Sequence, residues 1–176
     1  EKNKIDGSIC CVLSNSPKAY GLQRAKKVNI PTEILNHKKF SSREKFDQAL
    51  LEVLDEFKPD LVVLAGFMRI LSKKFVNTYM GRLLNVHPSL LPKYPGLNTH
   101  EKVLNSGDKH HGITVHFVDD SLDGGPICAQ SRFEIRTNSK EQIVEQIHKL
   151  EHKLYPKVIN WFAEGRLKLH KQRVLL

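Results

Sequence analysis

The sequence predicts an α/β fold built on a doubly wound, mostly parallel sheet, with a mixed antiparallel edge and a long C-terminal helix. Short β-branched apolar runs alternate with stretches of helical periodicity over the first hundred residues. Residues 61–65 are apolar throughout, which is typical of a strand buried on both faces of a parallel sheet. The strands predicted at 112–118 and 127–135 are separated by too few residues for a helical crossover, so we expect them to pair antiparallel.

The predicted elements of the first half alternate strand and helix. Helix starts are marked by a capping box, Ser41-x-x-Glu44, and by Ser72, while Pro59 ends a helix. The elements are a strand at 8–13, a basic helix at 20–28, a strand at 30–35, a helix from 41 to Pro59, the buried strand at 61–65 and a helix from Ser72 to about Tyr79.

The second half changes from alternation to a strand pair and a helix. A strand at 82–87 and a short helix at 99–105 come first, and the antiparallel pair follows. Between the helix at 99–105 and the strand at 112–118, His110 and His111 are interpreted as a surface loop pair. Ser139 should cap the final helix, in which Pro156 is expected to introduce a kink. One face of this helix is apolar: Ile143, Ile147, Leu150 and Leu154.

Length and composition predict a single globular domain in a reducing compartment. The 176 residues are 40% hydrophobic and 27% charged, and neither a signal-peptide pattern nor an apolar run of about 18 residues is present. Only three cysteines occur, Cys10, Cys11 and Cys128. An odd number with one adjacent pair argues against a disulfide framework, so we expect a cytoplasmic protein without a membrane partner.

The net charge of +9 does not by itself indicate a nucleic-acid-binding protein. Lysines and arginines are scattered, and no basic stripe with interleaved aromatic residues accompanies them. A solvated basic surface is one interpretation. The other is a positive field that attracts small polyanionic ligands, with no nucleic-acid partner.

Asn85 and His87 form the first candidate site. They alternate along the strand at 82–87, so their side chains project from the same face near its C-terminal end. In open α/β sheets that edge is where ligands bind. The alternative is a strand end with an ordinary polar cap.

Asp123 is a candidate third member, because Gly124 and Gly125 after it allow the backbone to approach a ligand closely. An amide, an imidazole and a carboxylate suit acyl transfer: the amide donates to a developing oxyanion, the imidazole shares protons and the carboxylate tunes the imidazole. The alternative is a turn aspartate.

His148 and His152 stand four residues apart on the last predicted helix, a spacing that could ligate zinc. The HExxH order and nearby cysteine ligands are missing, so a helix face lining a ligand pocket is favoured and no metal is expected. Arg43 lies in the first turn of a predicted helix, where an arginine is usually a solvated charge. Arg69 follows the strand at 61–65, where an arginine can reach an anion or a heterocycle.

Four stretches together resemble the phosphoribosylglycinamide formyltransferase family of folate-dependent enzymes. They read LAGFMRIL at 64–71, NVHPSLLPKYPG at 85–96, HFV at 116–118 and LDGGP at 122–126. The wider folate formyltransferase superfamily shares Asn-x-His and the later Leu-Asp-x-Gly, whereas HPSLLPKYPG is typical of this member. The resemblance runs essentially from end to end and implies the Rossmann-like formyltransferase fold.

The resemblance implies that 10-formyltetrahydrofolate donates its formyl group to the amine of glycinamide ribonucleotide, without a metal, in a monomer or homodimer. Asn85, His87 and Asp123 match the catalytic trio. Two further sets of positions match ligand contacts. The folate set is Arg43, Met68, Arg69, Ile70, Leu71, Val118, Asp119, Asp120 and Leu122. The nucleotide set is Val86, Pro88, Gly96, His148 and Glu151, the last of which would hold the ribose hydroxyls.

Residues 1–176 are therefore expected to form one formyltransferase domain that departs from the family at its start. The family begins with a strand, a phosphate-binding loop and a helix, and Glu1 to Lys4 align after that unit. Asn98 stands where the family would have a histidine.

Three other functions remain as alternatives. A formyltetrahydrofolate deformylase would use the same trio with water as acceptor, but should carry an additional N-terminal domain. A methionyl-tRNA formyltransferase should append a basic C-terminal domain. A ligand-binding relic without catalysis would fit the missing phosphate loop but not the intact trio.

Overall fold

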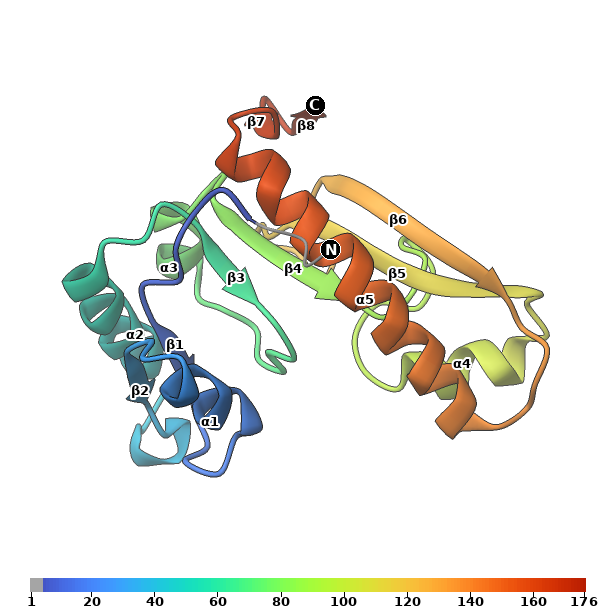
Figure 1. Ribbon diagram of the computed structural model, residues 1–176, viewed down its shortest axis with the longest axis horizontal. Helices are drawn as coiled ribbons and strands as arrows, with labels where there is room; N and C mark the ends of the chain where they lie inside the picture. Colours follow the sequence, from blue (N-terminus) through green and yellow to red (C-terminus); the bar gives the residue numbers. More distant parts are fainter. Residues whose placement is uncertain (1–4) are drawn as a thin grey trace.

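The computed structural model describes residues 5–176 and confirms the predicted α/β class (Figure 1). Residues 1–4, where the sequence is expected to depart from the family, lie outside the described residues. Strands β3, β4, β5 and β6 form one sheet in that order, while β1 pairs with β2 and β7 with β8 separately. The β1–β2 and β3–β4 pairs are parallel and the β4–β5 and β5–β6 pairs antiparallel, so the mixed edge is also confirmed.

The elements follow the predicted order closely. Those of the first half are β1 (Val12–Ser14), α1 (Tyr20–Lys27), β2 (Thr32–Ile34), the 3-10 helix η1 (His37–Lys39), α2 (Arg43–Phe57), β3 (Val62–Leu64) and α3 (Lys73–Thr78). Those of the second half are β4 (Leu83–His87), α4 (Thr99–Ser106), β5 (His110–Phe117), β6 (Ile127–Glu134), α5 (Lys140–Ala163), β7 (Lys168–His170) and β8 (Arg173–Leu175).

Strand β4 separates two core layers. Leu83 belongs to a cluster with Phe46 and Leu50 of α2 and Phe75 of α3. Its neighbour Leu84 is buried in a second cluster, with residues of β5 and α5. Because successive strand residues point to opposite faces, helices cover both faces of the sheet, as a doubly wound fold requires. Figure 1 shows α5 crossing the face of β4, β5 and β6. Asn85 and His87 share the face of Leu83.

Strand β3 is not buried on both faces as its apolar sequence predicted. Val63 is 40% exposed, and Ala65 just beyond the strand is also exposed. Among the described residues β3 pairs only with β4, so its other edge carries no strand that would cover these side chains. The uniform apolar run was therefore a sound strand signal but a wrong burial prediction.

Two boundary predictions need correction. Residues 8–11 of the first predicted strand are outside β1, which is short because it has only β2 beside it among the described residues. The helix α2 is capped by Ser42 rather than Ser41: the Ser42 hydroxyl accepts from the Lys45 N–H at 3.2 Å. Ser72 and Ser139 are N-caps as predicted.

The pair His110–His111 is part of β5 and not a surface loop. His111 is 1% exposed and its Nε2 lies 3.1 Å from Nδ1 of His100, whereas His110 is exposed. The strand begins earlier than predicted, because β6 pairs with it as far as His110. Alternation along a paired strand then turns one histidine inward.

Helix α5 runs continuously with Pro156 inside it, and the kink expected at this proline stays a prediction. No helix among residues 5–176 is long and apolar enough to cross a membrane. The three cysteines are free thiols, as the sequence indicated.

Candidate active site

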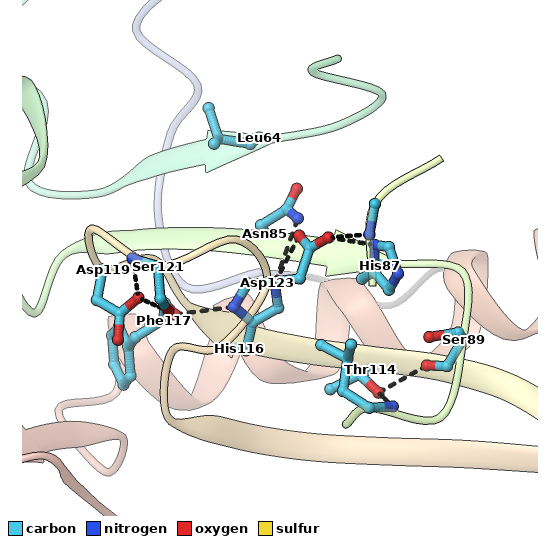
Figure 2. Close-up of polar contacts among 12 residues, drawn as sticks. Leu64, Asn85, His87, Ser89, Thr114, His116, Phe117, Asp119, Ser121 and Asp123 are labelled. Carbon is cyan, nitrogen blue, oxygen red and sulfur yellow. Dashed lines mark hydrogen bonds and ion pairs between the residues drawn. The ribbon is translucent and has the colours of Figure 1, made fainter. Parts of the chain in front are cut away.

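The carboxyl end of β4 holds the predicted amide and imidazole (Figure 2). Asn85 is partly buried, while the His87 side chain is 7% exposed. In the register of β4 and β5, Asn85 stands opposite His116, and His87 opposite Thr114. Thr114 is buried, accepts from the Leu91 N–H at 3.0 Å and donates to the Ser89 carbonyl at 2.7 Å. It therefore anchors the loop that follows His87.

The structure brings Asp123 to His87 from a distant loop. Asp123 Oδ2 lies 3.4 Å from His87 Nδ1, and the Asp123 side chain is only 14% exposed. The same oxygen accepts from the Gly96 N–H at 2.8 Å. Asp123 has a positive φ of 52°, which aspartate tolerates better than most residues. Three groups with no regular sequence spacing thus converge on one face of the sheet.

Both ring nitrogens of His87 face acceptors. The Tyr94 carbonyl, which can only accept, lies 2.9 Å from Nε2, so Nε2 carries a proton and donates to it. The Asp123 carboxylate faces Nδ1. An imidazolium ring would satisfy both contacts, whereas a neutral ring would turn a lone pair towards the carboxylate.

The loop that carries Asp123 is packed tightly against β5 by Gly125. A Cβ atom added at Gly125 would lie 1.9 Å from the Phe117 carbonyl oxygen. The Phe117 N–H also donates to the Pro126 carbonyl at 2.9 Å. The close backbone approach expected of the Gly-Gly pair is therefore made to the protein's own strand.

His116 is a site residue that the sequence analysis did not single out. Its ring is 2% exposed, its Nε2 lies 3.3 Å from Asn85 Nδ2 and 3.9 Å from Asp123 Oδ1, and its Nδ1 lies 2.9 Å from the Phe117 carbonyl. Burial lowers the pKa of His116, partly offset by that carbonyl and by the charge of Asp123. A signal was present: Thr114 and His116 alternate with apolar residues on β5.

Several of the positions expected to bind folate carry exposed apolar side chains. Met68, Ile70 and Leu122 are 73%, 56% and 56% exposed. The Arg69 guanidinium lies 5.1 Å above the Phe46 ring, and its buried Nε has no hydrogen-bond partner among the described residues.

The side chains at the remaining expected folate positions already contact other parts of the protein. Leu71 is a core residue, so only its backbone is available to a ligand, and Val118 packs against the same cluster. The Asp119 carboxylate accepts hydrogen bonds from the N–H and the hydroxyl of Ser121 in the same loop. Two positions are in surface ion pairs: Arg43 with Glu44 at 3.3 Å and Asp120 with Lys73 at 3.5 Å.

The expected nucleotide positions are more dispersed. Gly96 contacts Asp123 through its N–H, and Pro88 follows His87 directly. Val86 faces the core clusters beneath the sheet, which again leaves only its backbone for a ligand. On α5, His148 stacks on His152, and burial raises the pKa of the Glu151 carboxyl. No hydrogen bond or ion pair within residues 5–176 links His148 or Glu151 to the trio.

Two further predictions concern Asn98 and metals. Asn98 has a φ of 59° immediately before α4, and its side chain does not cap the helix; this backbone conformation is one that asparagine tolerates. Within the described part of the chain, no group of three or more His, Cys, Asp or Glu residues is arranged to hold a metal ion. That the reaction needs no metal stays a prediction.

Comparison with known proteins identifies the family. Residues 1–159 match the model of the formyl transferase family. The chain belongs to the formyl transferase family. It is 51% identical over 175 residues to the phosphoribosylglycinamide formyltransferase of Escherichia coli K12, covering 99% of this chain and 82% of that protein.

Solved structures agree with this membership of the formyl transferase family. The phosphoribosylglycinamide formyltransferase of Coxiella burnetii, in complex with CHES, superposes with a TM-score of 0.91 at 49% identity, covering 96% of this chain and 80% of that one. Glycinamide ribonucleotide transformylase 1 of Symbiobacterium toebii superposes with a TM-score of 0.93 at 39% identity, covering 98% and 82%.

Proposed function

We propose that this protein transfers the formyl group of 10-formyltetrahydrofolate to the amine of glycinamide ribonucleotide, a step of purine biosynthesis. The observation that carries the proposal is the convergence of Asn85, His87 and Asp123 at a strand end in a chain half identical to an enzyme named for this reaction. Each of the three groups has a task in acyl transfer.

In the proposed reaction the substrate amine attacks the formyl carbon, and a C–N bond forms as the carbonyl electrons move onto oxygen. Asn85 and His87 donate hydrogen bonds to this oxyanion. The carbonyl re-forms, the bond from carbon to folate N10 breaks, and the amine's proton is transferred to N10. Asp123 holds His87 in its donor form and assists the proton transfer, directly or through water.

His87 needs a free N–H for the formyl oxygen. Asp123 is charged and is itself anchored by the Gly96 N–H, whereas the Tyr94 carbonyl is neutral and lies on a loop. The oxyanion is therefore expected to take the place of the Tyr94 carbonyl at His87 Nε2, while Asp123 keeps its contact with Nδ1.

For the folate, the exposed apolar side chains of Met68, Ile70 and Leu122 are proposed to cover the pterin, with Arg69 beside them. The unpaired Nε of Arg69 supports this placement, because a buried donor without an acceptor is costly and a ligand atom would satisfy it. Arg43 would meet the glutamate tail once released from Glu44.

For the nucleotide, the proposed contacts are Gly96, Pro88, the Val86 backbone, and Glu151 with His148 on α5. The raised pKa of Glu151 follows from its burial. A ribose diol would supply hydrogen bonds to this carboxylate in place of lost water.

We also infer that one further parallel strand belongs between β1 and β3 and carries the phosphate-binding turn. Leu13 of β1 and Val62 and Leu64 of β3 pack against one core cluster, so both sheets rest on the same helices. Each of these strands has one unpaired edge among the described residues, an arrangement that natural sheets avoid. The mass of the intact protein tests this: an active protein of 20.2 kDa would refute it.

The activity is tested by incubating the whole protein with 10-formyltetrahydrofolate and glycinamide ribonucleotide. We expect equal amounts of formylated nucleotide and tetrahydrofolate by mass spectrometry. Folate consumption without formylated nucleotide would overturn the proposal in favour of water as acceptor. Asp55→Asn, an exposed aspartate on α2, is the control for charge removal and should match the wild type.

A further inference from the structure

His116 lies beneath the amide of Asn85 (Figure 2). The two residues are opposite partners in the β4–β5 register, and a hydrogen-bond distance of 3.3 Å separates Asn85 Nδ2 from His116 Nε2. The ring is almost wholly buried, so His116 meets Asn85 from the protein side rather than from solvent.

The hydrogen bonds around His116 determine which atom of the Asn85 amide faces it. The Phe117 carbonyl can only accept, so His116 Nδ1 carries a proton and donates to it at 2.9 Å. In the neutral ring, Nε2 then has a lone pair and can only accept. Asn85 must therefore present its NH2 group, because its oxygen would meet that lone pair.

The surroundings favour this neutral form. Burial lowers the pKa of His116, although the Phe117 carbonyl and Asp123 act in the opposite direction. A second proton on Nε2 would make it a donor facing the Asn85 NH2 group, and would draw it towards Asp123 Oδ1, now 3.9 Å away. The neutral ring thus accepts from Asn85 and leaves the Asp123 carboxylate to its contact with His87.

The pairing of β5 with β6 is irregular beside this residue. The β5–β6 register shifts between Val115 and His116, with Val115 opposite Ala129 and His116 opposite Ile127. The extra residue is Cys128 of β6, and bulges of this kind are common beside active sites. The pairing of β5 with β4 stays regular and holds the His116 ring opposite the Asn85 amide.

We propose that His116 is a positioning residue that fixes the orientation of the Asn85 amide, so that an N–H and not the carbonyl oxygen meets the formyl oxygen. The two amide orientations have nearly the same shape, so packing alone does not choose between them. The flipped amide would oppose its own oxygen to the developing oxyanion. This inference rests on the proposed formyl transfer and assigns an orientation device to the same site.

Two substitutions separate orientation from structure. His116→Phe keeps a ring but removes the acceptor, so we expect kcat to fall about tenfold with both KM values within twofold of wild type. His116→Gln offers a side-chain oxygen near the position of Nε2 and should recover most of the loss. If His116 had only a structural role, the acceptor of His116→Gln would not restore the kcat that His116→Phe loses.

The decisive experiment is a double-mutant cycle with Asn85→Ala. If His116 acts through the amide, His116→Phe should change kcat less than twofold in the Asn85→Ala background. The same tenfold loss in both backgrounds, or wild-type kcat for His116→Phe, would overturn the inference. Wild-type protein that makes no formylated nucleotide would instead overturn the proposed function.

Folding of each variant is checked by its thermal midpoint and by folate binding measured through fluorescence quenching. Should His116→Phe fail to fold, His116→Met replaces it in the cycle, because a flexible apolar chain fills the space without an acceptor. The same two outcomes then support or overturn the inference.

Discussion

Replacing Gly125 by alanine tests whether tight packing of the loop on β5 positions Asp123. The added Cβ would lie 1.9 Å from the Phe117 carbonyl oxygen, 3.0 Å from its carbon and 3.3 Å from the Asp119 nitrogen. All three are backbone atoms, which cannot rotate away as a side chain would. The loop must therefore move outward by roughly 1.5 Å to reach ordinary contact distances.

A movement of that size would reach Asp123, two residues earlier. Its Oδ2 lies 3.4 Å from His87 Nδ1 and 2.8 Å from the Gly96 nitrogen, so a shift of about 1.5 Å weakens both contacts. Misplacement of a catalytic group on this scale costs about 10²-fold in rate. Overpacking should also lower the free energy of unfolding by about 1–3 kcal/mol.

The assay for Gly125→Ala is kcat for formyl transfer, measured alongside urea unfolding. Gly21→Ala is the control, because nothing lies within 4 Å of its Cβ position in α1, and we expect unchanged kcat and slightly higher stability. Gly124→Ala would meet the Ser121 side chain, which can rotate, so a smaller loss is expected. A kcat for Gly125→Ala within twofold of wild type would refute the reasoning.

Three further outcomes are expected. Burial lowers the pKa of His111 from 6.5 to about 4, so between those pH values only the unfolded chain binds the proton, and acidification should cost about 3 kcal/mol of stability. Urea unfolding at pH 7 and pH 4 should show this loss in the wild type but not in His111→Phe. Asp123→Asn should nearly abolish turnover while preserving folate binding in fluorescence titration; a wild-type rate would remove Asp123 from the mechanism. Burial raises the pKa of the Cys128 thiol to about 12, so iodoacetamide at pH 8 should label exposed Cys10 well before Cys128, and equal rates would contradict that burial.

Local signals in the sequence predicted the elements well. The caps at Ser72 and Ser139 and the alternation at Asn85 and His87 involve residues only a few positions apart, so the chain's own periodicity is enough to indicate them. The antiparallel pair β5–β6 followed from the short connection between two strands.

Burial was harder to predict because it depends on neighbours in space. Val63 lies in a uniformly apolar strand yet is exposed, since β3 has one unpaired edge among the described residues. His111 looked like a loop residue and is buried, since pairing with β6 extends β5 as far as His110. In both cases the burial of the side chain depends on which strand pairs beside it, and the local sequence does not show that pairing.

The site depends on the same distinction between local pattern and pairing. Asn85 and His87 could be predicted as a pair because they share one strand, whereas His116 requires the β4–β5 register, which places it opposite Asn85. A slip of one residue would put Val115 there and remove the acceptor beneath the amide. Sheet pairing therefore contributes to the chemistry as much as to stability: the register orients the oxyanion donor, and Gly125 brings the carboxylate to the imidazole from outside the sheet.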